Sequence, residues 1–274
     1  MLISAGPRQT IGTASGSRLR FGEEPKTAGT WAGRRLLWLD EAPAFELSFW
    51  CGTCPCLFQR LEGSTSTCSI ADVERRLADG LQGVDDDVIA QFGRLLPRGD
   101  YLPLLMGIQP RLVHPSQPGD YFAEEQVATW GLNAFWDLPE NPRTPYYRTF
   151  ETVIDVDAHL FEFVVPMVPP SWNDPGHVID YKTQLAESPT MTAVAVSVLD
   201  ICQPAVDNAT DYVAHWALTH FLLDGHHKMQ AAADSGQQLQ LLSLLSIDAG
   251  LARPDQVTQI PELRAAPPTS RPAH

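Results

Sequence analysis

The feature that most constrains the fold is a strand–turn–helix–strand unit near the C-terminus. An apolar run over residues 212–223 predicts a buried strand, and Asp224-Gly225 then provides a tight turn with a helix N-cap. Three alanines in a row favour a helix, and Gly236 is a residue type that commonly ends one. A second apolar run over 239–247 predicts the next strand. We expect the chain to adopt an α+β fold.

The first turn of the predicted helix carries an unusual concentration of basic side chains. His226, His227 and Lys228 follow Gly225 directly. Unpaired backbone N–H groups and the helix dipole already make this end positive, so each cation there is disfavoured by roughly 0.3–1 kcal/mol. One interpretation is that an anion, most commonly phosphate, binds in the turn. The other is that the imidazoles are neutral and hydrogen-bond local carbonyl groups.

The same segment, Asp224-Gly225-His226-His227-Lys228, resembles the DGHHR-type turn of the ParB/sulfiredoxin superfamily, in its free-serine-kinase-like branch. Lys228 replaces the arginine usual in that branch, which keeps the charge but loses the bidentate fork. His226 stands where sulfiredoxins carry a reactive cysteine, so sulfinic-acid reductase chemistry is not expected.

Two further segments extend this resemblance upstream. Residues 161–170 resemble the opening strand of the superfamily with its proline exit, and residues 189–198 resemble its P-x-x-V middle strand. The resemblance covers roughly residues 158–250. It implies a ParB/sulfiredoxin-like mixed sheet with short helices over residues 151–255.

The resemblance implies a nucleotide-dependent phosphotransferase that acts on a small hydroxyl-bearing metabolite. The nucleotide would be ATP or ADP, with CTP as a further option, and its phosphates would bind at Gly225, His226, His227 and Lys228. Asp224 would hold Mg²⁺, and Asp224 and His226 would take part in catalysis. Lys228 and the histidines would offset charge on the transferred phosphoryl group.

Glu162 is a further catalytic candidate. It interrupts the apolar run 160–165, and a carboxylate in a buried strand needs a partner or a function. Desolvation would raise its pKa toward a range useful to a general base. Free serine kinases use a glutamate near the phosphate turn to deprotonate the acceptor hydroxyl, and the resemblance implies this role for Glu162. The alternative is a glutamate on an exposed strand face.

Two other groups of residues are candidates for metal binding. Asp155 and Asp157, with His159, are predicted on one face of an extended segment and would bind Mg²⁺, or form a solvated strand edge. The second group consists of the thiols Cys51, Cys54, Cys56 and Cys68. These thiols fit zinc, a redox dithiol built on the C-x-x-C spacing, or a tight turn with inert buried thiols.

Composition excludes some classes of function. The chain has 274 residues and a net charge of −14, which argues against a general nucleic-acid interface. It has no 18-residue apolar run and no apolar signal region, so neither a membrane span nor secretion is expected. Five cysteines without framework spacing suit a reducing, cytoplasmic location. A small-molecule partner is expected, and homodimerisation stays open.

The chain divides by composition into four regions. Residues 1–30 are predicted to be a flexible arm, and residues 256–274 a disordered, proline-containing tail. Residues 31–150 are predicted to be an irregular α+β region, rich in aromatic residues and proline, that contains the cysteine cluster and packs with the domain at 151–255. The aromatic side chains would fill a core under long loops, or line a ligand pocket.

Three functions remain open at this stage. The leading one is the phosphotransferase, and on balance we expect the protein to be an enzyme. The second is a non-catalytic nucleotide-binding regulatory or partner-binding protein. The third is a zinc or thiol-redox protein that uses Cys51, Cys54 and Cys56.

Overall fold

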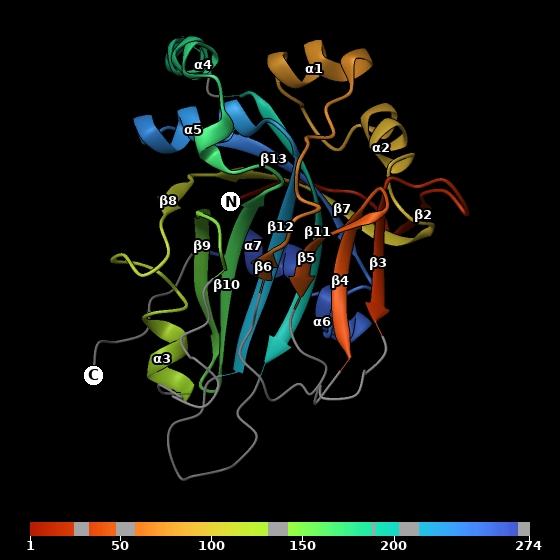
Figure 1. Cartoon of the computed structure of the whole chain (residues 1–274), viewed down its shortest axis with the longest axis vertical. Helices are drawn as coiled ribbons and strands as arrows, with labels where there is room; N and C mark the ends of the chain where they lie inside the picture. Colours follow the sequence, from red (N-terminus) through yellow and green to blue (C-terminus); the bar gives the residue numbers. More distant parts are fainter. Residues whose placement is uncertain (25–32, 48–57, 131–141, 188–189, 203–213, 268–274) are drawn as a thin grey trace.

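The computed structural model of the chain describes all residues except 25–32, 48–57, 131–141, 188–189, 203–213 and 268–274. It contains a large sheet and a small sheet. Figure 1 shows the small sheet in front of the large one, helices α6 and α7 behind it, and helices α1, α4 and α5 near its top end.

The large sheet is mixed, and its order is β1-β7-β13-β11-β12-β10-β9-β8, with β2 also paired to β7. Its strands are β1 (Leu2–Ala5), β2 (Gln9–Ile11), β7 (Gly99–Ile108), β8 (Arg111–Val113), β9 (Tyr146–Asp155), β10 (Ala158–Pro166), β11 (Thr192–Cys202), β12 (Ala214–Asp224) and β13 (Leu239–Ser246). Strand β10 runs parallel to β12 and β11 runs parallel to β13, while the other pairs are antiparallel. The carboxyl ends of β10 and β12 therefore lie at the same edge of the sheet.

The remaining elements are a small antiparallel sheet and short helices. The small sheet consists of β3 (Leu19–Glu24), β4 (Arg34–Leu39), β5 (Ala42–Leu47) and β6 (Phe58–Arg60). The helices are η1 (Ala71–Val73), α1 (Glu74–Asp79), α2 (Asp86–Gly93), α3 (Glu125–Trp130), η2 (Pro170–Trp172), α4 (Pro175–Glu187), α5 (His226–Ser235), α6 (Pro254–Val257) and α7 (Ile260–Ala265). The expected α+β class, with a mixed sheet and short helices, is confirmed.

Both faces of the large sheet are covered. One face packs against the small sheet, α1 and α2, and the other packs against α4 to α7. All eight residues of β13 and ten of the eleven in β11 are buried. Double burial explains why these strands read in the sequence as continuous apolar runs rather than as alternating patterns.

The two ends of the chain are more ordered than the composition predicts. The expected flexible arm at 1–30 contains β1, β2 and β3, and the expected tail at 256–274 contains α7. The predicted disorder at these positions is therefore wrong for the described residues. Long-range pairing with β7 and β4 and packing of α7 on the sheet stabilise segments whose local composition is polar or proline-rich.

The predicted boundary at residue 151 also differs from the structure, because it falls inside β9. Strand β7, from the expected N-terminal region, pairs with β13 from the expected C-terminal domain. Aromatic residues between them, among them Tyr121 and Tyr146, are buried in the core. This agrees with the interpretation that they fill a core under loops.

Within the described residues, no helix is long and apolar enough to span a membrane.

Candidate functional site

The predicted turn lies at the shared carboxyl edge of β10 and β12, between the end of β12 and the start of α5. The N-cap is Gly225 rather than Asp224, and its φ is +93°. A Cβ at this position would lie 2.8 Å from the Cβ of Ala193. Glycine is required here both by the left-handed backbone and by the close approach of β11. Gly236 ends α5 in the left-handed conformation, as predicted.

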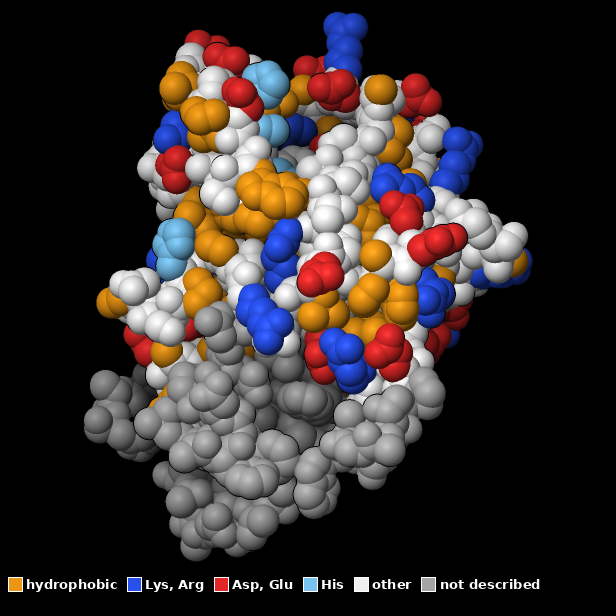
Figure 2. Space-filling model, in the orientation of Figure 1, with side chains coloured by type: hydrophobic (Ala, Val, Ile, Leu, Met, Phe, Trp, Pro, Cys, Tyr) orange, Lys and Arg blue, Asp and Glu red, His pale blue; other side chains and the backbone are white. Residues whose placement is uncertain are grey.

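A cavity of about 510 Å³ opens beside this turn. Its walls come from three separate parts of the chain: the α5 turn (224–228), one face of α4, and residues 67–74 at the start of η1 and α1. Helix α4 contributes His177, Asp180, Tyr181 and Gln184, whose spacing places them on one side of a helix. Pale blue histidine side chains gather near the top of the molecule, where α4 and α5 lie (Figure 2).

In the part of the chain that the structure describes, no side chain caps the start of α5. The first backbone hydrogen bond of the helix runs from Met229 N to Gly225 O, at 2.8 Å. Among the described residues, no acceptor is found for the backbone N–H groups of His226, His227 and Lys228. The turn therefore presents unpaired N–H donors beside a cavity, which is the geometry that binds anions at helix N-termini.

His226 adds a buried donor at the same place. His226 is one of the residues that line the cavity, although it is only 4% exposed, and its Nε2 accepts a hydrogen bond from Met167 N at 3.1 Å. Burial, with a smaller contribution from His227, lowers the pKa of His226 to about 3. The ring is therefore neutral, and since Nε2 accepts a hydrogen bond, the proton is assigned to Nδ1. Within the described part of the chain this Nδ1–H has no hydrogen-bond partner.

His227 is also neutral at ordinary pH. Its Nε2 accepts a hydrogen bond from Asp174 N at 3.1 Å, and its ring contacts the edge of His177 at a centroid distance of 5.3 Å. Burial, followed by the influence of His177, lowers the pKa of His227. The interpretation with neutral imidazoles is thus correct about their charge. The rings accept hydrogen bonds from backbone N–H groups, however, and among the described residues they do not donate to carbonyl groups as expected.

The contacts of Lys228 indicate a structural role in the turn. Its Nζ donates to Thr192 O at 3.0 Å and lies 3.8 Å from Asp224 Oδ2. Burial lowers the pKa of Lys228, while Asp224 and Glu74 act in the opposite direction. Lys228 therefore fixes the turn against β11 and holds Asp224 in place.

The structure does not bring Glu162 to this turn. Glu162 pairs in register with Leu218, six residues before Asp224 on β12, so the two carboxylates are about 20 Å apart along the strand direction. Its carboxylate is fully buried, 3.0 Å from Arg264 Nε, and accepts from Thr149 Oγ1 at 2.6 Å. Burial by itself would raise its pKa, but Arg264, His220 and Thr149 together lower it to about 2. A carboxylate held ionised in this way is a poor general base.

Arg264 is the partner that the sequence did not indicate. It lies on α7, in the predicted tail, and is 1% exposed. Its guanidinium also donates to Gly107 O at 3.3 Å and stacks over the Phe150 ring at 4.1 Å. His220, on the same face, hydrogen-bonds Ser197 through Nδ1 at 2.6 Å. These groups form a buried polar network inside the core, distant from the α5 turn.

The other predicted metal ligands are separated as well. Asp155 and Asp157 flank the turn between β9 and β10, and Asp157 N donates to Asp155 Oδ1 at 2.8 Å. They lie at the opposite end of β10 from the α5 turn, so they do not converge with Asp224. The expected continuous strand is a hairpin because Val156-Asp157 forms its turn.

The cysteine cluster is only partly described. Cys51, Cys54 and Cys56 lie outside the described residues. Cys68 is buried and free, and burial raises its pKa to about 11. Among the described residues, no group of three or more His, Cys, Asp and Glu side chains could hold a metal ion.

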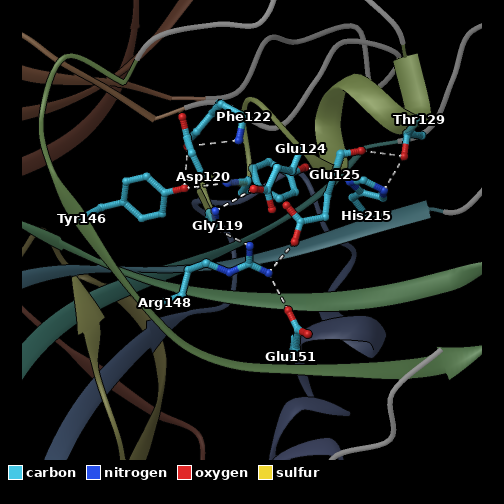
Figure 3. Close-up of polar contacts among 11 residues, drawn as sticks. Gly119, Asp120, Phe122, Glu124, Glu125, Thr129, Tyr146, Arg148, Glu151 and His215 are labelled. Carbon is cyan, nitrogen blue, oxygen red and sulfur yellow. Dashed lines mark hydrogen bonds and ion pairs between the residues drawn. The ribbon is translucent and has the colours of Figure 1, made fainter. Parts of the chain in front are cut away.

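A second cavity of about 810 Å³ lies at the other end of α5, near Asp234. Arg148 occupies its wall and bridges Glu125, at 2.6 Å, and Glu151 (Figure 3). Next to it, the buried Asp120 accepts from Tyr146 Oη at 2.8 Å. These charges compensate one another, so this cluster has the character of a structural network.

Comparison with known proteins gave no match: no family model, no curated protein and no solved structure is similar to this chain.

Proposed function

We propose that the cavity beside the α5 turn binds the phosphate groups of a nucleotide. The observation that carries this proposal is the set of three unpaired backbone N–H groups, at His226, His227 and Lys228, in a turn whose residues line the cavity. Unpaired N–H donors at a helix start favour an anion, and phosphate oxygens in the cavity would accept hydrogen bonds from them. The attraction comes from oriented neutral donors and the helix dipole, not from charged histidines.

The reaction that best suits this cavity is transfer of a phosphoryl group to a small hydroxyl-bearing metabolite. Asp224 and Glu74 both line the cavity. Carboxylate oxygens suit Mg²⁺, which proteins usually hold through one or two carboxylates together with substrate phosphates. In this proposal Asp224 holds the metal ion, and Glu74 takes the place of Glu162 as acceptor of the hydroxyl proton.

A relation to the ParB/sulfiredoxin superfamily supports the same function and is part of the proposal. The left-handed Gly225, the short α5 helix and the mixed sheet are compatible with it. A cytoplasmic location and a small-molecule partner also belong to the proposal.

Calorimetric titration with ADP and ATP, each with and without Mg²⁺, tests the binding step. We expect Gly225→Ala, which strains the left-handed turn that orients the three N–H groups, to weaken binding at least tenfold. Gly16 also has a positive φ but lies outside the cavity, and it provides the matched control Gly16→Ala, which should bind like the wild type. Equal affinity of both variants would refute the site.

Detection of phosphorylated products with hydroxyl-bearing compounds tests the transfer step. We expect Glu74→Gln to keep nucleotide affinity and lose turnover by at least a hundredfold. Binding without turnover in the wild-type protein would instead favour the regulatory nucleotide-binding function.

A further inference from the structure

The face of α4 that lines the cavity is held firmly against α5. Asn173 Nδ2 donates to Gln230 Oε1 at 2.7 Å, and Asp174 N donates to the ring of His227. At the far end, Lys182 Nζ lies 2.8 Å from Asp234 Oδ2. The side chains on this face therefore keep a defined position relative to the α5 turn.

Three side chains on this face are available to a ligand. Asp180 and Gln184 are four residues apart, and Tyr181 lies between them with a half-buried ring. Within the described residues, none of the three side chains makes a hydrogen bond or ion pair that would occupy it. Residues four apart on a helix are neighbours, at roughly 5–6 Å between Cβ atoms. The wall thus offers an acceptor-only carboxylate, an aromatic ring and an amide within the reach of one flat molecule.

We infer that this wall binds a guanine base, so that the ligand of the cavity is a guanine nucleotide. This inference rests on the proposed function, because it requires the phosphates to bind at the α5 turn. Guanine presents two adjacent donors, N1–H and the N2 amino group, beside the acceptor O6. Asp180 accepts from the two donors, and the amide of Gln184 donates to O6. The ring packs on Tyr181, as bases commonly do on aromatic side chains.

The other bases fit this arrangement less well. Adenine and cytosine each place a ring nitrogen acceptor beside their amino group, so a carboxylate that accepts from the amino group also meets a lone pair. Uracil has a single N–H between two carbonyl groups. An acceptor-only side chain therefore discriminates in favour of guanine. The cavity volume of about 510 Å³ is in the range of small-molecule sites.

The test is calorimetric titration of the full chain with GDP, ADP, CDP, xanthosine diphosphate and inorganic pyrophosphate. We expect GDP to bind at least tenfold more tightly than ADP and CDP. Asp180→Asn should weaken the binding of GDP at least tenfold. It should improve the binding of xanthosine diphosphate, since xanthine has a carbonyl group where guanine has the N2 amino group. Glu187→Gln, a neutralised carboxylate on the same helix outside the cavity, should change neither affinity.

The outcomes separate this inference from the proposed function. Equal affinities for GDP, ADP and CDP, or an unchanged GDP affinity in Asp180→Asn, would overturn guanine recognition and leave phosphate binding intact. Failure of every nucleotide and of pyrophosphate to bind would overturn both. Because Asp180 is exposed, loss of folding in Asp180→Asn is not expected, and a thermal melt checks it.

Discussion

The ion pair between Glu162 and Arg264 makes a demanding prediction about stability. Arg264→Leu removes the cation and leaves a carboxylate that is fully buried. Breaking a buried pair by removing one partner typically costs about 3–5 kcal/mol, because the remaining charge is uncompensated. We therefore expect Arg264→Leu to lower the free energy of unfolding at pH 7 by about that amount.

The lowered pKa of Glu162 also makes a pH-dependent contribution to stability of similar size. Its folded-state pKa is about 2, whereas the ordinary value is 4.5. Since the folded-state pKa is lowered, the stabilisation is present above pH 4.5 and is lost as the pH falls from 4.5 to 2. The difference corresponds to about 3 kcal/mol at about 1.4 kcal/mol per pH unit.

Urea denaturation of the wild type and variants between pH 3 and 7 measures both effects. In Arg264→Leu, burial without the guanidinium raises the pKa of Glu162, so its carboxyl group takes up a proton more readily in the folded state as the pH falls. Acidification should then stabilise the variant relative to the wild type. In the double variant Glu162→Gln/Arg264→Met both charges of this buried pair are gone, and we expect it to recover at least half of the loss.

Two results would refute this reasoning. One is a cost below about 1 kcal/mol for Arg264→Leu, which would mean that the ion pair with Glu162 contributes little to stability. The other is a difference in stability between Arg264→Leu and wild type that does not change with pH, which would mean that the charge of Glu162 is not involved.

Two further predictions concern the α5 turn. Gly225→Ala should cost about 1–3 kcal/mol in thermal or urea unfolding, because alanine at φ +93° is strained and its Cβ would meet Ala193; a neutral effect would mean that the turn is wrongly described. Inorganic sulfate, which does not titrate near neutral pH, should not lose affinity as the pH rises through about 6.5, because burial lowers the pKa of His226 to about 3 and also lowers that of His227. An affinity that falls as the pH rises through about 6.5 would instead indicate charged imidazoles.

The sequence predicted the local elements around the turn well because their signals are local. The apolar runs of β11, β12 and β13 and the terminating Gly236 all follow from residues close together in the chain. The hairpin at Val156-Asp157 was missed because both of its strands have similar composition and its turn lacks glycine and proline.

The remaining features depend on contacts between distant residues. The role of Glu162 was misjudged because its partner, Arg264, is about a hundred residues away, in a segment whose composition suggests disorder. The α4 wall of the cavity was missed for the same reason, since Asp180 and Gln184 resemble any polar helix surface until α4 is seen beside α5. The neutral state of His226 follows from burial. The sequence does not reveal this burial, because the adjacent lysine and histidine suggest a charged and exposed segment.

The cavity is bounded by three stretches of chain, at residues 67–74, 177–184 and 224–228, that lie far apart in the sequence. A molecule seated there would connect all three at once. Binding of the molecule would therefore affect both η1 and α4. These two segments would undergo local opening to solvent less often. A bound ligand would in this way link the local stability of a segment in the first third of the chain to that of a segment in the last third.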